Sequence, residues 1–151
     1  MLGCFSPMHA CIDNFIHTYA GVELRLKMHE IMTKQGHEEE TGKAKITSGY
    51  NLPAKYVLHT VGPIIQWKVT QEDENLLASC YKECLKLAAD TGVESIAFCC
   101  LSTGVFRFPQ QRAAEIATET VMQFLKKDDR IKKVIFNVFK NEDLEIYSHL
   151  L

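Results

Sequence analysis

The strongest constraint on the fold is a long amphipathic segment that leads directly into a short, almost wholly apolar one. From Glu72 to Asp90, apolar residues recur at helical spacing, acidic residues open the segment and Gly92 follows its end. This pattern predicts a long helix. The next segment, SIAFCCL at residues 95–101, is typical of a strand that is buried on both faces. A helix joined closely to such a strand indicates a layered α/β domain.

The same alternation runs through the rest of the chain. Residues 13–36 carry apolar side chains at three- and four-residue spacings, which predicts a helix, or two short helices interrupted at Gly21. The other expected elements are strands at residues 44–47 and 55–63, a helix at 110–127, a strand at 132–139 and a terminal helix from Asn141. This order favours an α/β fold with a largely parallel central sheet and covering helices.

Length and composition narrow the function classes. The 151 residues fit one domain spanning 1–151, and 46% hydrophobic with 24% charged residues suits a soluble globular protein. A net charge of -2 predicts no general attraction to nucleic acid or to anionic membranes. No apolar run reaches the length of a membrane span and no signal-peptide pattern is present. We therefore expect a cytoplasmic protein with a discrete small-ligand site.

Cysteine and histidine cluster near the N-terminus, in GCFSPMHACID at residues 3–13. Cys4, His9 and Cys11 would supply three zinc ligands and leave the fourth position open, as catalytic zinc sites do. The spacing is not a common zinc-finger spacing. On the residues alone, a loop with two buried thiols and a surface histidine is an equal alternative.

A second candidate segment follows the apolar strand. In open α/β sheets, ligands bind beyond the carboxyl ends of the strands, and the loop STGVF lies at such an end. Small side chains and one glycine would let backbone amides approach a phosphate. The same pattern also fits an ordinary strand-to-helix connection. The loop consists of Ser102, Thr103, Gly104, Val105 and Phe106.

Two long segments resemble the macrodomain family, whose members bind ADP-ribose. They are ITSGYNLPAKYVLHTVGP at residues 46–63 and STGVFRFPQQRAAEIA at residues 102–117. Before the first helix, GCFSPMHAC replaces the family's usual glycine-rich run and is similar to the loop of a zinc-dependent microbial branch. Members of that branch remove ADP-ribose from modified proteins. The resemblance implies a three-layer α/β/α macrodomain-like fold with a mixed, largely parallel sheet.

The resemblance also assigns roles to individual residues. Cys4, His9 and Cys11 would hold a Zn²⁺ ion beside the distal ribose, and Ile12 and Asp13 would lie along the diphosphate and that ribose. The residues from Ser102 to Phe106 would wrap the diphosphate. Phe139 and Asn141 fall where the family often contacts adenine or its ribose.

Several of these residues have plainer alternatives. Asp13, the expected catalytic residue, would orient the sugar or a water molecule, but Asp is also suited to capping the helix that it opens. His17 is better explained as a packed or surface histidine than as a fourth ligand, and His59 as a hydrogen-bonded core histidine. Phe139 would fit core packing as well as ligand contact.

The chain begins where the family is already well into its fold, so the resemblance implies an N-terminally truncated form. The missing part includes sheet strands, and an uncovered sheet edge predicts a homodimer. The implied partners are ADP-ribose and mono-ADP-ribosylated proteins, a lipoyl-carrier protein among them in some organisms. Two alternatives are an ADP-ribose-binding module without catalysis and a fragment with weak ligand affinity.

Overall fold

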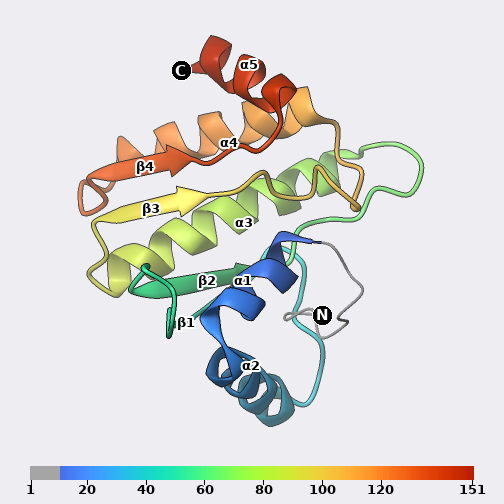
Figure 1. Cartoon of the computed structure of the whole chain (residues 1–151). Helices are drawn as coiled ribbons and strands as arrows, with labels where there is room; N and C mark the ends of the chain where they lie inside the picture. The colour runs from blue at the N-terminus through green and yellow to red at the C-terminus, as the bar shows by residue number, and fades with distance from the viewer. Residues whose placement is uncertain (1–10) are drawn as a thin grey trace.

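Helices and strands alternate along the chain in the computed structural model, which describes residues 11–151 (Figure 1). The elements in order are α1 Ile12–Ala20, α2 Val22–Gln35, β1 Ala44–Ser48, β2 Tyr56–Thr60, α3 Gln71–Asp90, β3 Ser95–Phe98, α4 Gln110–Leu125, β4 Lys133–Phe136 and α5 Asn141–Leu150. The predicted alternation is confirmed. Both sheet strands near the C-terminus end three residues earlier than expected, so residues 99–101 and 137–139 belong to loops at the carboxyl ends of β3 and β4.

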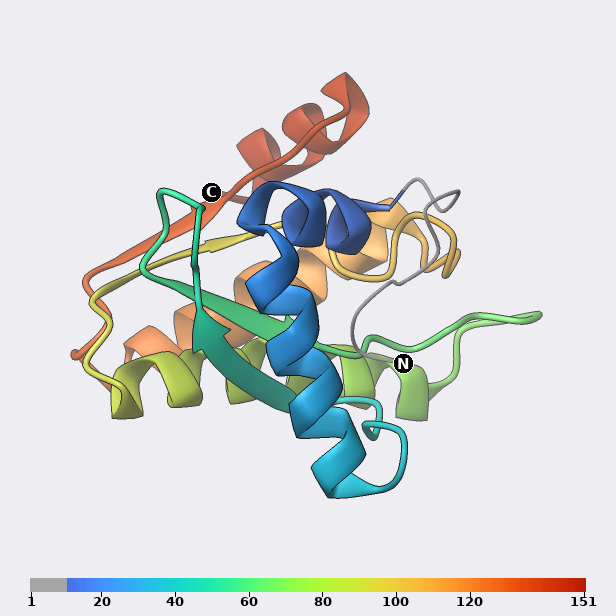
Figure 2. The ribbon, with the colours of Figure 1, turned by 60° about the horizontal axis from the view of Figure 1, so that its bottom comes forward.

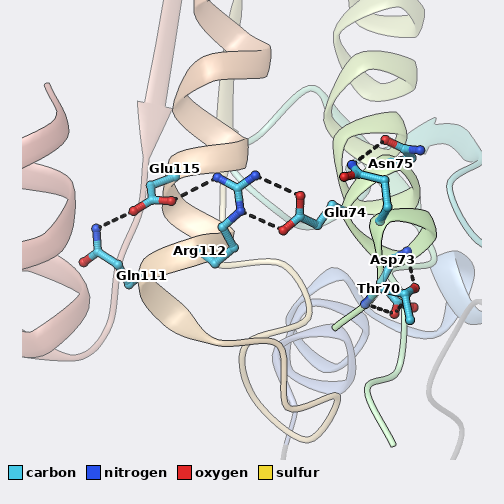
Figure 3. Close-up of polar contacts among 8 residues, drawn as sticks. Thr70, Asp73, Glu74, Asn75, Gln111, Arg112 and Glu115 are labelled. Carbon is cyan, nitrogen blue, oxygen red and sulfur yellow. Dashed lines mark hydrogen bonds and ion pairs between the residues drawn. The ribbon is translucent and has the colours of Figure 1, made fainter. Parts of the chain in front are cut away.

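The long helix α3 begins where the sequence supplies a capping box. The Thr70 side chain accepts a hydrogen bond from the Asp73 amide at 3.2 Å, and the Asp73 carboxylate accepts one from the Thr70 amide at 2.9 Å (Figure 3). Together they satisfy two amides that have no partner inside the helix. The helix ends before Gly92, whose φ of 76° is left-handed.

Gly21 separates α1 from α2, so the second form of the prediction, two short helices, is confirmed. Its φ is 91°, and a Cβ at this position would lie 2.6 Å from the Asn51 side-chain nitrogen. Any other residue would strain the backbone, and the Asn51 side chain would have to move. The glycine thus permits the sharp change of direction that lays α2 across the β1–β2 hairpin (Figure 2).

In the described part of the chain, the strands form two separate pairs. β1 and β2 are antiparallel, with Ala44 opposite Thr60, while β3 and β4 are parallel, with Ser95 opposite Lys133. The described strands thus form one antiparallel and one parallel pair, rather than a largely parallel sheet. The short, turn-rich connection between β1 and β2 can join antiparallel strands only, whereas β3 and β4 are joined through α4.

The prediction that residues 95–101 are buried on both faces is wrong for the described residues. Ile96 and Phe98 are buried, whereas Ser95 and Ala97 are exposed. Ile96 and Phe98 face the main core, which α3 and α4 complete. The opposite face of the β3–β4 pair is not covered by a described helix, and this is why the strand alternates.

Two hydrophobic clusters flank the β1–β2 hairpin. Leu58 of β2 packs toward the main core beneath α3, while its neighbour Val57 packs toward the smaller cluster of Ala20, Leu24 and Met28. Successive strand residues point to opposite faces, so the hairpin lies between α2 and α3 in an α/β/α arrangement (Figure 2). No helix in the described ranges is long and apolar enough to cross a membrane.

Candidate functional site

The first turn of α1 presents Cys11 and Asp13. Cys11 is the N-terminal cap: its backbone is extended, and its Sγ accepts a hydrogen bond from the Asn14 amide at 3.4 Å. The alternative that Asp13 caps this helix is therefore wrong, because Asp13 already lies inside the first turn. Its partly exposed carboxylate suits the positive end of the helix.

Only one of the three predicted zinc ligands can be placed. Cys4 and His9 lie outside the described residues, while Cys11 is half-buried at the start of α1. A thiolate that accepts an amide hydrogen bond can still ligate a metal, since such outer contacts orient metal ligands. The zinc site stays a prediction.

His17 lies one helical turn after Asp13 and is fully buried. Its Nε2 is 3.7 Å from Asp13 Oδ1, and its ring centroid is 5.7 Å from that of His59 in β2, with the planes tilted by 49°. His59 Nε2 is 2.9 Å from the Thr47 hydroxyl of β1. His59 is thus confirmed as a hydrogen-bonded core histidine, and His17 is a packed histidine rather than a surface one.

Burial keeps both imidazoles neutral near pH 7. It lowers the pKa of His59 to about 4, with a smaller contribution from His17. It also lowers the pKa of His17, where the Asp13 carboxylate opposes the shift and the Arg25 guanidinium reinforces it. Taking a charged imidazolium out of water is costly, which explains the direction in both cases.

Asp13, His17 and His59 form a group that the sequence did not reveal. Each offers one potential ligand atom, and these atoms lie within 4.8 Å of one another. The spacing of Asp13 and His17 on one helix face was a usable signal. No such signal in the sequence pointed to His59, because only the pairing of β1 with β2 brings it beneath α1.

The loop from Ser102 to Phe106 is held by its own backbone. The Phe108 amide donates to the Ser102 carbonyl at 3.0 Å, and the Arg107 amide donates to the Gly104 carbonyl at 3.0 Å. Ser102 and Arg107 have φ angles of 62° and 59°. Left-handed conformations at non-glycine residues are strained and tend to mark functional sites. Here they are the first residue of the segment that the sequence predicts to bind a diphosphate and the residue directly after it.

Within this loop, a run of backbone amides points to no described acceptor. No described group accepts a hydrogen bond from the amides of residues 103–106, and Gly104 and Val105 are exposed. Successive amides without partners form a concave anion-binding nest. Helix α4 begins at Gln110, after Pro109.

The segment after β2 closely approaches this loop. A Cβ on Gly62 would lie 2.0 Å from Ser102 Oγ, and the Ile65 amide donates to the Phe106 carbonyl at 2.8 Å. The chain has therefore brought the carboxyl ends of β2 and β3 together, and Gly62 is needed for that approach. Gly62 and Ser102 belong to the two segments that resemble the macrodomain family, residues 46–63 and 102–117.

Asp13 acts electrostatically on the same region. Burial raises the pKa of the Cys99 thiol directly after β3, and the Asp13 carboxylate contributes to that increase, so the two groups are neighbours. Both views place the start of α1 beside the loop that follows β3 (Figures 1 and 2). The structure thus gathers Ile12, Asp13 and the loop at one end of the sheet.

Phe139 and Asn141 follow β4 at the same end. The Asn137 amide donates to the Phe98 carbonyl at 2.7 Å, which holds the segments after β3 and β4 together. Phe139 is 99% exposed, so the core-packing alternative is wrong. Asn141 is exposed at the start of α5. An aromatic ring in this position is available to a ligand, and its contact with adenine stays a prediction.

A separate groove of about 390 Å³ lies between α4, β4 and α5. Its lining is mostly apolar and includes Val121, Phe136 and Tyr147. It contains none of the residues predicted for the site. The candidate site is therefore defined by the loop and the start of α1, not by this groove.

The macro domain family model matches residues 4–117, which is most of the chain and includes both the start of α1 and the loop after β3. The chain belongs to the macro domain family. This macro domain is 59% identical over 151 residues to a protein-ADP-ribose hydrolase of Treponema medium, covering 100% of this chain and 58% of that protein. It is 56% identical over 148 residues to a protein-ADP-ribose hydrolase of Staphylococcus aureus, covering 97% of this chain and 56% of that protein.

Solved macrodomains have the same fold. The Oceanobacillus iheyensis macrodomain with ADP superimposes with a TM-score of 0.86 at 39% identity, covering 93% of this chain and 74% of that one. The Trypanosoma brucei macrodomain in complex with ADP gives a TM-score of 0.79 at 34% identity, covering 93% of this chain and 56% of that one. The α/β macrodomain fold predicted from the sequence is confirmed. The chain spans 58% and 56% of the two curated relatives' lengths.

Proposed function

We propose that this macro domain binds ADP-ribose at the carboxyl ends of β2 and β3 and hydrolyses its bond to modified proteins. The observation that carries the proposal is the run of amides at residues 103–106 without described partners, in the loop beside the start of α1. A diphosphate is the ligand group that such a run of amides suits. The relatives named protein-ADP-ribose hydrolase support the reaction.

The loop and α1 have different tasks in this proposal. The loop amides hold the diphosphate, and Ile12 and Phe106 flank it, so that the distal ribose lies near Asp13. Asp13 orients the ribose or the attacking water. Fixing both reactants in this way lowers the entropic part of the barrier. The water oxygen bonds to the anomeric carbon as the bond to the protein side chain breaks, and the side chain leaves with a proton.

Zinc dependence is the finer part of the proposal. Cys4, His9 and Cys11 would hold Zn²⁺, and the donor set of thiolate and imidazole groups fits that ion. The half-buried Cys11 thiol at the start of α1 is positioned on the turn that carries Asp13. When bound, zinc would supply Lewis acidity beside the distal ribose.

We further propose mono-ADP-ribosylated proteins as the substrates, a lipoyl-carrier protein among them, and the cytoplasm as the location. Cys80, Cys84, Cys99 and Cys100 are free thiols, as expected of a reducing compartment. A second candidate function is an ADP-ribose-binding module without turnover. It is favoured by the length of the relatives, of which this chain spans 58% in the Treponema protein, since the remainder of such a protein could carry part of the activity.

Three measurements on the purified chain test these proposals. Isothermal titration with ADP-ribose tests binding. Release of ADP-ribose from a mono-ADP-ribosylated protein, with and without a chelator, separates hydrolase from binding module. Elemental analysis tests the metal, with about one zinc per chain expected.

Variants assign the metal to its ligands. His9→Ala should lose the zinc and reduce turnover at least about tenfold while ADP-ribose binding is retained. His29→Ala, an exposed histidine of α2, is the matched control and should behave as the wild type. A metal-free chain whose turnover is indifferent to both chelator and added zinc would exclude the zinc proposal and leave the binding proposal standing.

A further inference from the structure

Two buried histidines have no task in the proposed reaction. His17 is 0% exposed and His59 is 5% exposed. Burying a polar ring is costly unless it is satisfied by a partner, yet an apolar residue could pack between α1 and the hairpin. What distinguishes these rings is their place directly behind Asp13.

A line of polar side chains runs from β1 to the start of α1. It begins with the Thr47 hydroxyl, 2.9 Å from His59 Nε2. The His59 ring packs against His17 with a centroid separation of 5.7 Å. His17 Nε2 then lies 3.7 Å from Asp13 Oδ1. Side chains from three elements thus form a line that ends at the partly exposed carboxylate of Asp13.

We infer that His17, backed by His59 and Thr47, is a positioning residue for Asp13, holding its carboxylate toward the distal ribose. The inference rests on the proposed function of Asp13. His17 cannot reach a substrate itself, because it is fully buried, so it acts through Asp13. At 3.7 Å the contact is an ion–dipole contact rather than a hydrogen bond, and it limits which way the carboxylate can turn.

A metal ion held by the same group is a weaker explanation. The potential ligand atoms of Asp13, His17 and His59 lie within 4.8 Å of one another, but only one of the three groups is anionic. The Arg25 guanidinium is close enough to act on His17 electrostatically. A divalent cation there would meet a second positive charge with a single carboxylate to offset both.

The first test is steady-state kinetics of ADP-ribose release by the full chain. His17→Leu should lower kcat about 10- to 100-fold, the cost of a misplaced catalytic group, with KM changed less than about twofold. His17→Gln keeps a polar nitrogen near Asp13 and should recover most of that loss. His29→Leu, on the exposed face of α2, is the control. A glutamine variant no better than the leucine variant overturns the inference.

A double-mutant cycle separates positioning from a structural role. If His17 acts only through Asp13, His17→Leu should cause no further loss of kcat in an Asp13→Ala background. Additive losses overturn the inference. Thr47→Val provides a second variant in case His17→Leu does not fold, and its smaller loss of kcat should also vanish in the Asp13→Ala background.

Two further readouts keep this inference distinct from the proposed function. If the wild type binds ADP-ribose without turnover, hydrolysis is excluded, and the same cycle is measured on the Kd for ADP-ribose, with non-additivity expected again. A wild type that neither binds nor releases ADP-ribose overturns both ideas. Zinc content should be equal in wild type and His17→Leu; loss of zinc would make His17 a ligand and overturn the positioning role.

Discussion

Gly104 occupies the exposed middle of the loop after β3, and its backbone does not require glycine. Its φ is not among the left-handed angles of the described chain, and a Cβ there would meet nothing within 4 Å. Because neither the backbone conformation nor the packing requires glycine here, the space that a side chain would fill is open to a ligand. In the proposed site, that space lies where the diphosphate approaches the loop amides.

Gly104→Ala should therefore separate binding from stability. The free energy of unfolding should change by less than about 0.5 kcal/mol, while ADP-ribose affinity falls about tenfold because the methyl group crowds the ligand. Calorimetric titration and urea denaturation measure the two quantities. Gly92→Ala is the control. It should lower the free energy of unfolding, because Gly92 has a φ of 76°, but it should leave ADP-ribose affinity unchanged, because the residue is remote from the loop. Unchanged affinity in Gly104→Ala would place the diphosphate elsewhere.

His59 makes the stability of the fold depend on pH. Burial lowers its pKa to about 4 in the folded chain, whereas an unfolded histidine titrates near 6.5. Between these values the unfolded state binds more protons, so stability is full above about pH 6.5 and is lost as the pH falls toward 4. His17 shifts in the same direction and adds to the effect.

From pH 7 to pH 5, His59 alone should cost about 2 kcal/mol of unfolding free energy. Urea denaturation at the two pH values measures this loss, and His59→Gln should reduce it by that amount. His37→Gln, an exposed histidine, should leave it unchanged. An equal pH dependence in wild type and His59→Gln would show that another group is responsible.

At the scale of elements, the start of α3 fixes the helix that supports both the hairpin and α4. Figure 3 shows the Thr70–Asp73 capping box and, one residue further, Glu74 paired with Arg112 of α4. Arg112 Nε and Nη2 each lie 2.8 Å from a Glu74 oxygen, and Nη1 lies 3.0 Å from Glu115. The pair is partly exposed, so salt screens it and its contribution is small. Its main effect is to set the start of α4, directly after the loop.

Thr70→Ala should destabilise the chain by about 1 kcal/mol, the usual cost of removing an N-terminal cap. Urea denaturation gives the value. Thr33→Ala, at an exposed position inside α2, should have no effect or be slightly stabilising, because alanine is the better helix former. Equal effects of the two substitutions would mean that the capping box is not what stabilises α3.

For the whole molecule, the β3–β4 pair is the exposed feature with the clearest consequence. Ala97 and Ile135 lie on its uncovered face, and β2 and β3 have no strand partner on their remaining edges in the described ranges. Unpaired edges invite pairing with another chain. We therefore propose that the isolated chain forms a homodimer through this part of the sheet.

Size-exclusion chromatography with light scattering should show a dimer that grows with concentration. Ala97→Asp should shift the equilibrium toward the monomer, since pairing of β3 with β3 of a second copy would bring two like charges close together across the strands. Gln123→Asp, exposed on α4, is the control and should leave the equilibrium unchanged. A clean monomer at all concentrations would exclude the homodimer.

The amino-acid sequence by itself determined which segments become helices and strands, because the period of apolar residues depends only on local geometry. It also determined where the loop STGVF lies, since that loop follows a strand and precedes a helix. The long helix α3, the break at Gly21 and the family were all readable in this way. The zinc ligands stay a prediction from the sequence, since Cys4 and His9 lie outside the described residues.

Only the tertiary structure decided how those segments meet. The covering of β3 on one face, the exposure of Phe139 and the alignment of Thr47, His59 and His17 behind Asp13 all depend on contacts between residues far apart in the chain. Even the cap of α1 was settled by backbone geometry, which placed Cys11 rather than Asp13 at the helix start. The physical reason is that a residue type limits the contacts it can make, but packing between elements selects the partner.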